Sequence, residues 1–459
     1  MNQIIDLKEV SNIRFNGESK IIVMFITSQK EADFASLFTA NENKKALEGF
    51  ESLKNNFDSN TIFNLAGAYY IDKQYDKALD LYKKLIKDKS DFAEVYNNMG
   101  VIYGEQNNFT EAINNYNLAL KYKPDLSIVH HNIGVENKIN NLYEKAINNY
   151  SKSIELNPDD ANSYYNRANI YYLTGNFDSA ITDYSKAIKL APENAKFFNN
   201  RAITEAEKTT IYESSIKDYT KAIELKPNYT EAYYNRGIAY SNIALFDKAI
   251  EDFSKAIELE PDFAGAYYYR GNAFFNMQKY EKALNDYTKL IKIKPDFYKA
   301  YLNRGSANSL LNNYDEAIED YSNALKLSSN DSDVYYYRGN AFFSTGRAEG
   351  FKLAVNDYTK VINSKPTLKA YHNRGSAYAQ LGDYQRAIED YTKALAISKN
   401  ESETFYLRGF AYEALEKKEL AKLDYENACK LLYQDACNAL KGEKQKETKK
   451  DGVVGISTN

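Results

Sequence analysis

Asparagine side chains recur along this chain at an interval that would place them on one continuous surface. An asparagine side chain both donates and accepts hydrogen bonds, so a row of them can bind the backbone of an extended peptide without contacting its side chains. The pattern predicts a peptide-binding surface, and the alternative is that these side chains only cover a solvated helix face. The series, spaced by 34 or 35 residues or by about twice that, is Asn98, Asn132, Asn166, Asn200, Asn235, Asn303 and Asn373.

Tyrosines accompany this series, one residue before its positions. A phenol ring offers an apolar body with a polar tip, which suits it to line pockets for the side chains of a bound peptide. We therefore expect the asparagines to supply backbone hydrogen bonds and the tyrosines to supply selectivity. These tyrosines are Tyr165, Tyr234, Tyr268, Tyr336 and Tyr406.

An arginine and an aspartate recur at the same interval, and they change together. Both are absent from the first three copies of the interval and present in the next eight. This covariation predicts an ion pair within each copy, because pairing with the following copy would leave Asp424 without a partner. Independent drift of a duplicated block is the alternative explanation. The arginines are Arg167, Arg201, Arg236, Arg270, Arg304, Arg338, Arg374 and Arg408, and the aspartates are Asp183, Asp218, Asp252, Asp286, Asp320, Asp357, Asp390 and Asp424.

The chain carries none of the short motifs that mark catalytic or metal-binding chemistry. HExxH, CxxC, GxxxxGK[ST] and GxSxG are all absent. His130 takes the place of a helix tyrosine, which favours a packing role over metal binding. Cys429 and Cys437 are too few for a disulfide scaffold, so we expect buried thiols, with a strained or redox-active pair as the alternative. We expect no catalytic residue, no cofactor and no metal, and therefore no enzyme.

The recurring side chains need a scaffold with the same interval, and the prolines mark it. A period near 34 residues indicates one supersecondary unit copied along the chain, as in solenoid proteins. Within residues 264–297, Gly271 lies in a first helix with one apolar stripe, Ala283 lies in a second, and Pro295 ends the second. The small residues allow the two helices to approach closely. All seven prolines follow the period, at positions 124, 158, 192, 227, 261, 295 and 366.

The pattern of small, aromatic and proline positions, such as Gly271, Tyr287 and Pro295, resembles the tetratricopeptide repeat family over about residues 59–435, as eleven units. The resemblance implies an all-α fold, a right-handed α-solenoid of tandem helix–turn–helix units whose first helices line a concave groove. It also implies protein or peptide partners. The asparagine series resembles the asparagine track of O-linked N-acetylglucosamine transferases. None of the residues that precede its positions is basic, so the clamp for a C-terminal carboxylate found in some co-chaperones is not expected.

The ends of the chain depart from the period. Residues 1–26 form a non-repeat segment, in which Asn16 and Gly17 between two apolar runs favour a β-hairpin. The ninth unit has extra residues at 344–350, interpreted as a longer turn between its helices, either a tolerated insertion or a partner contact. The remaining segments are expected to be a degenerate repeat at 27–58, a C-terminal capping helix at 436–441 and a disordered tail at 442–459.

Charge and hydropathy narrow the classes of partner. The chain has 59 basic and 63 acidic residues, so its net charge of −4 supplies no basic field for nucleic acid. The apolar run at residues 21–26 is far shorter than the roughly 20 residues that cross a membrane as a helix. We expect a protein or extended peptide partner, no nucleic acid and no membrane span. Self-association through the solenoid ends is a further expectation.

The sequence thus predicts a scaffold or adaptor that binds protein or peptide partners in the concave groove of its repeats. The alternative is a non-catalytic accessory subunit of a complex that modifies or exports proteins. We expect a cytoplasmic location, although a mis-assigned start codon could hide an export signal.

Overall fold

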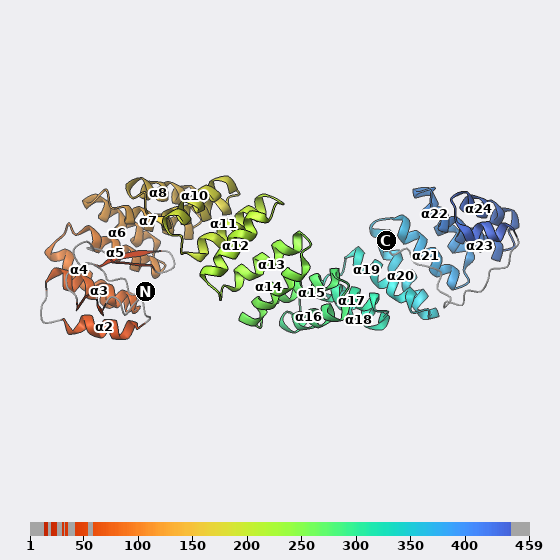
Figure 1. Ribbon diagram of the computed structural model, residues 1–459, viewed down its shortest axis with the longest axis horizontal. Helices are drawn as coiled ribbons and strands as arrows, with labels where there is room; N and C mark the ends of the chain where they lie inside the picture. Colours follow the sequence, from red (N-terminus) through yellow and green to blue (C-terminus); the bar gives the residue numbers. More distant parts are fainter. Residues whose placement is uncertain are drawn as a thin grey trace. The chain divides into compact units, whose positions relative to one another are not determined.

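The computed structural model describes residues 13–16, 20–24, 30–31, 33–34, 42–53 and 58–441. Within these residues the chain forms 24 helices and two short strands (Figure 1). The chain divides into two compact units, residues 1–229 and 230–459, which we call the N-terminal and C-terminal units. Among the described residues, no helix combines the length and apolar character needed to cross a membrane.

The N-terminal unit contains both strands, the single helix α2 and five pairs of helices. The strands β1 (Ile13–Asn16) and β2 (Ile21–Met24) pair in antiparallel register, with Asn16 opposite Ile21, where the sequence favours a hairpin. Its helices are α2 (Asn43–Ser52), α3 (Ser59–Ile71), α4 (Tyr75–Asp88), α5 (Ala93–Glu105), α6 (Phe109–Tyr122), α7 (Ser127–Ile139), α8 (Tyr143–Leu156), α9 (Ala161–Leu173), α10 (Phe177–Leu190), α11 (Ala195–Lys208) and α12 (Glu213–Leu225).

The C-terminal unit contains six further pairs of helices and one terminal helix. The predicted tail at 442–459 lies outside the described residues. The helices of the C-terminal unit are α13 (Thr230–Asn242), α14 (Phe246–Leu259), α15 (Ala264–Asn276), α16 (Tyr280–Ile293), α17 (Tyr298–Leu310), α18 (Tyr314–Leu327), α19 (Ser332–Ser344), α20 (Ala348–Ser364), α21 (Leu368–Gln380), α22 (Tyr384–Ile397), α23 (Ser402–Ala414), α24 (Lys418–Lys430) and α25 (Gln434–Leu440).

Each repeat is one helix pair, from α3 with α4 to α23 with α24, and the odd-numbered member is its first helix. The small residues act as the sequence predicts. A Cβ atom on Gly271 would come within 2.7 Å of the Tyr287 ring, which is almost fully buried. The ring of the second helix therefore packs directly on the backbone of the first, and this contact fixes the spacing of the pair.

The sequence analysis expected the extra residues of the ninth repeat to lengthen the turn between its helices. The structure shows that they do not. Helix α20 begins at Ala348 and has 17 residues, against 14 in α18 and α22. Phe351 is buried against Phe343, with ring centroids 5.1 Å apart. The insertion therefore adds almost one turn to the second helix, because its apolar residue finds a partner in the first.

The C-terminal helix α25 packs on α24, and Ala436 between them is fully buried. Cys429 on α24 and Cys437 on α25 form a disulfide, with Cα atoms 4.9 Å apart. The expectation of two buried thiols is therefore wrong. The turn between the helices reverses the chain within a few residues, and this reversal brings together two cysteines eight positions apart.

Candidate functional site

The recurring arginine and aspartate meet within each repeat. In the seventh repeat, Arg270 Nε donates to Asp286 Oδ2 at 2.8 Å and Arg270 Nη2 donates to Asp286 Oδ1 at 2.7 Å. The Asp286 side chain is 6 % exposed and that of Arg270 is 19 % exposed. The pair therefore joins the two helices of one repeat in a largely buried position. The same pairs are Arg167–Asp183, Arg201–Asp218, Arg236–Asp252, Arg304–Asp320, Arg338–Asp357, Arg374–Asp390 and Arg408–Asp424.

In at least seven of these pairs the arginine also bonds a hydroxyl group of the preceding repeat, which the sequence analysis missed. Arg270 Nη1 donates to Ser254 Oγ at 2.9 Å, so one guanidinium joins three helices. The hydroxyl series starts at Ser151, one repeat before the first arginine, and this offset is the signal that could have revealed it. Its other members are Ser185, Thr288, Ser322, Thr359 and Thr392.

Burial and pairing act on these charges in opposite directions. Burial raises the pKa of the Asp320 carboxyl above its ordinary value, and the hydrogen bonds from Arg304 oppose that shift. The hydrogen bonds to Asp218 raise the pKa of the Arg201 guanidinium. The Arg201 guanidinium therefore stays charged, and we assign these pairs to the structure of the repeat rather than to ligand binding.

The asparagine series lies on the first helices, and one member holds a strand of the chain itself. Asn98 on α5 is fully buried. Its Nδ2 donates to the carbonyl oxygen of Val23 on β2 at 2.8 Å, and its Oδ1 accepts from the Val23 amide at 3.0 Å. Asn98 Nδ2 also donates to the Tyr82 hydroxyl at 3.0 Å. One asparagine thus forms hydrogen bonds to both the backbone N–H and the backbone C=O of an extended residue.

In three later repeats, a second asparagine orients the asparagine that belongs to the series. Asn303 Nδ2 donates to Asn272 Oδ1 at 2.9 Å, and the same oxygen accepts from the Tyr287 hydroxyl at 2.8 Å. This relay fixes one N–H of Asn303 and so sets the orientation of its amide. The equivalent relays are Asn200 with Asn169 and Tyr184, and Asn373 with Asn340 and Tyr358.

The other members of the series have different surroundings. Asn132 on α7 is fully buried and donates to Asn97 Oδ1 at 2.9 Å. Asn166 on α9 is 6 % exposed, and Asn235 lies half-buried on α13. The buried members therefore do not cover a solvated helix face, which was the alternative interpretation.

A further asparagine, Asn64 on α3, occupies the same position in the first repeat and was missed. It is fully buried and donates to Glu31 Oε1 at 3.0 Å. It lies 34 residues before Asn98, so the period itself could have identified it. Val23 and Glu31 thus contact the asparagine positions of the first two repeats.

The tyrosines predicted to select peptide side chains are half-buried and pack at the joints between repeats. Tyr165 packs on Phe197 of the next repeat, with centroids 4.8 Å apart, and its hydroxyl accepts from Asn200. Burial raises the pKa of Tyr234 to about 12, so this phenol stays neutral. The corresponding contacts are Tyr234 with Phe263, Tyr268 with Phe297 and Tyr406 with Tyr433, and the Tyr336 hydroxyl accepts from Asn373 of the next repeat.

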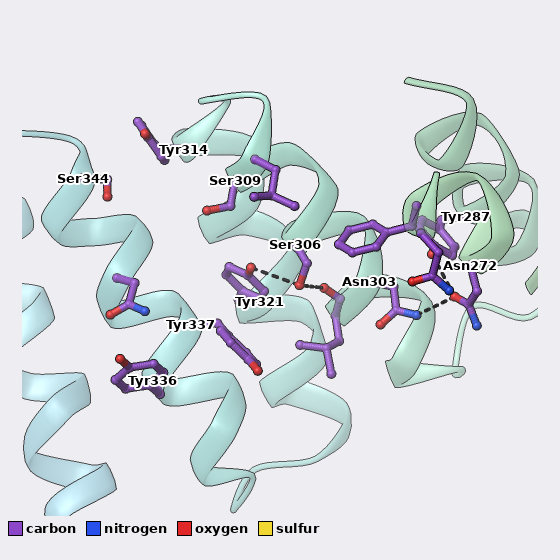
Figure 2. Close-up of a pocket in the computed structure, with 15 residues that line it drawn as sticks. Asn272, Tyr287, Asn303, Ser306, Ser309, Tyr314, Tyr321, Tyr336, Tyr337 and Ser344 are labelled. Carbon is purple, nitrogen blue, oxygen red and sulfur yellow. Dashed lines mark hydrogen bonds between the residues drawn. The ribbon is translucent and has the colours of Figure 1, made fainter. Parts of the chain in front are cut away.

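A groove of about 800 Å³ in the C-terminal unit brings several of these residues together. Figure 2 shows Asn303 and Tyr336 of the predicted site within it, lining it with Asn272. The sequence analysis missed the residues one and two turns along α17, such as Ser306 and Ser309, although helical periodicity places them on the same face. The other lining residues include Leu302, Leu310, Tyr314, Tyr321, Tyr337, Asn340 and Ser344.

Two family models match the chain, and together they cover more than half of it. The model described as tetratricopeptide repeat matches residues 93–126, 161–194, 230–263, 264–297 and 368–401. The model described as TPR repeat matches residues 67–107, 140–175, 212–243 and 310–346.

Among the described residues, no group of three or more His, Cys, Asp or Glu side chains could hold a metal ion.

Individual proteins resemble parts of the chain. Human tetratricopeptide repeat protein 13 is 37% identical over 91 residues, which are 18% of this chain and 11% of that protein. Small glutamine-rich tetratricopeptide repeat-containing protein 2 of Saccharomyces cerevisiae (strain ATCC 204508 / S288c) is 31% identical over 101 residues, 22% of this chain and 29% of that protein. The matched part therefore spans less than a third of either relative.

Solved structures also resemble part of the chain. A crystal structure of MamA protein is 30% identical, with a TM-score of 0.35, and the match covers 37% of this chain and 92% of that one. The crystal structure of YrrB, described as a TPR protein with an unusual peptide-binding site, is 26% identical with a TM-score of 0.37. That match covers 40% of this chain and 95% of that one.

Proposed function

Because this chain belongs to the tetratricopeptide repeat family, whose members act as scaffolds for protein interactions, we propose that it binds extended segments of partner proteins along the first helices of its repeats. We propose no catalytic role for it. The partner supplies a backbone in extended conformation, and the asparagine series supplies the matching donors and acceptors.

The observation that carries this proposal is the contact between Asn98 and Val23. The Asn98 amide bonds both the N–H and the C=O of one residue in a strand, at 3.0 and 2.8 Å. Nothing in this contact depends on the side chain of Val23. An asparagine at this position of a first helix is therefore suited to bind any backbone that lies extended across it.

The groove of the C-terminal unit offers the same chemistry. One N–H of Asn303 is held by Asn272. In this proposal its Oδ1 and its second N–H bind the partner's backbone, as the Asn98 amide binds that of Val23. A single hydrogen bond contributes only about 0.5–1.5 kcal/mol net. Several such contacts in register are needed to overcome the loss of freedom of a flexible ligand.

Affinity capture with the full chain tests this function. We expect that proteins retained by the wild-type chain bind about tenfold more weakly to Asn303→Ala, because two backbone hydrogen bonds are lost. The matched control is Asn285→Ala, an exposed asparagine on the second helix α16, which should retain them fully. Equal capture by all three chains would place the binding surface elsewhere.

The same capture addresses the alternative roles. A stoichiometric enzyme among the retained proteins would indicate an accessory subunit of a modifying or export complex. Light scattering of the purified chain would reveal self-association.

A further inference from the structure

The strand β2 lies against the first helices α3 and α5. Lys20 just before the strand, and Val23 and Met24 within it, contact first helices of the repeats. The Lys20 side chain is 3 % exposed, and its Nζ lies 2.8 Å from Glu136 Oε1 on α7 and 3.5 Å from Glu105 Oε1 on α5. The Glu136 side chain is equally buried. The Lys20 ammonium group thus lies between carboxylates of two first helices, α5 and α7.

A glycine makes the room for this ion pair. A Cβ atom on Gly104 would lie 1.9 Å from Glu136 Oε1 and 2.6 Å from Lys20 Nζ. No side chain larger than that of glycine therefore fits beside the pair. The helix α5 is shaped to accept a lysine at this point, and we call Gly104, Glu105 and Glu136 the lysine socket.

A second glycine makes room for Met24 at the other end of the strand. Met24 is fully buried, and its Cγ would lie 3.2 Å from a Cβ atom on Gly67. Gly67 stands at the position that Asn169 and Asn272 occupy in later repeats, where they orient the asparagine series. In the first repeat the orienting side chain is therefore replaced by space for methionine.

We propose that this surface of α3, α5 and α7 is a specific binding site for an extended segment of the pattern Lys-x-x-x-Met. In this proposal residues 20–24 are an internal ligand, and a partner segment with the same chemistry displaces them. The inference rests on the proposed function and names the ligand class for the N-terminal unit. The socket selects the lysine, Asn98 binds the backbone three residues later, and the Gly67 space accepts the methionine.

A buried ion pair distinguishes this site from an apolar plug. Burying two charges costs desolvation energy that an apolar side chain would avoid, so such a pair adds specificity of register more readily than stability. The tether also explains why a partner would have to compete. A segment of the same chain acts at a high effective concentration, so it lowers the apparent affinity of any segment added in trans.

Fluorescence anisotropy with a labelled synthetic peptide of residues 17–26 tests the proposal on full-length chains. We expect the Lys20→Ala chain to bind this peptide about tenfold more tightly than the wild-type chain, because its own segment competes less. The control chain is Lys30→Ala, which removes an exposed lysine ten residues after Lys20 and should bind like the wild type. A peptide with alanine in place of its lysine should bind the Lys20→Ala chain about tenfold more weakly.

Hydrogen exchange on the wild-type chain gives a second test that needs no variant. The Val23 amide of the chain is bonded to Asn98, so it should exchange slowly alone and faster with excess unlabelled peptide. Continued protection at saturating peptide, or equal peptide affinity for all three chains, would overturn the proposal. Capture that depends on Asn303 is measured separately, so that failure would leave the proposed function standing.

Discussion

At the scale of single residues, the arginines do the most to join this chain into repeats. Each guanidinium bonds the aspartate of its own repeat, and at least seven of them also bond a serine or threonine of the preceding one, as Arg270 does with Asp286 and Ser254. Such a pair need not add net stability, because desolvation offsets the attraction. Its geometry nevertheless specifies how three helices meet, since only one arrangement satisfies all of its hydrogen bonds.

Removing one member of a pair should therefore be costly. We expect Arg270→Ala and Asp286→Ala each to destabilise the chain by about 3–5 kcal/mol, because each leaves a largely buried charge without its partner. Denaturant unfolding measures the change. Arg386→Ala is the control, since Arg386 pairs with Asp383 at the surface, and it should leave the stability unchanged. Losses below about 0.5 kcal/mol for both core variants would show that the pairs are not effectively buried.

The same residues show which contacts can be predicted from the sequence at this scale and which cannot. Arginine and aspartate vary together within one copy of the period, so their pairing could be predicted. Ser254 belongs to the preceding copy and varies out of step with Arg270, so a comparison within copies does not detect it. The packing of Tyr165 between repeats was missed for the same reason, because its partner Phe197 belongs to the next copy.

At the scale of elements, the ends of the repeat array depend on contacts that the repeats do not make for themselves. The short helix α25 covers α24 and is linked to it by the disulfide between Cys429 and Cys437. A terminal repeat has no neighbour to cover its outer face, so a cap of this kind is needed there. A helix of seven residues is too short to be stable by itself, which makes the link important.

Reduction of this disulfide should loosen the cap. Closing so short a loop stabilises by roughly 2–3 kcal/mol in the chain-entropy account, so the amides of α25 should exchange much faster after reduction. A chain with Cys429→Ala and Cys437→Ala should not respond to reductant. Two reactive thiols in the untreated chain would contradict the pairing.

At the scale of the whole molecule, the helices within each unit contact mainly their neighbours along the chain. Stability in such an array is approximately a sum of contributions from single repeats and from the joints between them. The contacts within and between repeats use the same residue types from one repeat to the next, such as the small residue, the aromatic ring and the arginine. One repeat should therefore be removable without loss of the fold.

Deletion of residues 264–297, which removes α15 and α16 together, should leave a folded chain. We expect the same helical content per residue by circular dichroism and a lower resistance to denaturant, because one repeat and one joint are lost. Deletion of residues 280–297 alone is the control. It removes only α16 and should disrupt the fold, because α15 then lacks its partner. Equal disruption by both deletions would show that the repeats are not interchangeable.

The sequence by itself determined the period, the helix pairs and the partners of the recurring charges. These follow from side chains that contact one another at a constant separation, so repetition along the chain makes each contact visible several times. The tertiary structure alone decided that β2 lies on Asn98, that Lys20 enters between Glu105 and Glu136, and that the cysteines are joined. Each of these contacts occurs once and links segments outside the common period, so no repetition reports it, and only the position of the backbone in space brings the groups together.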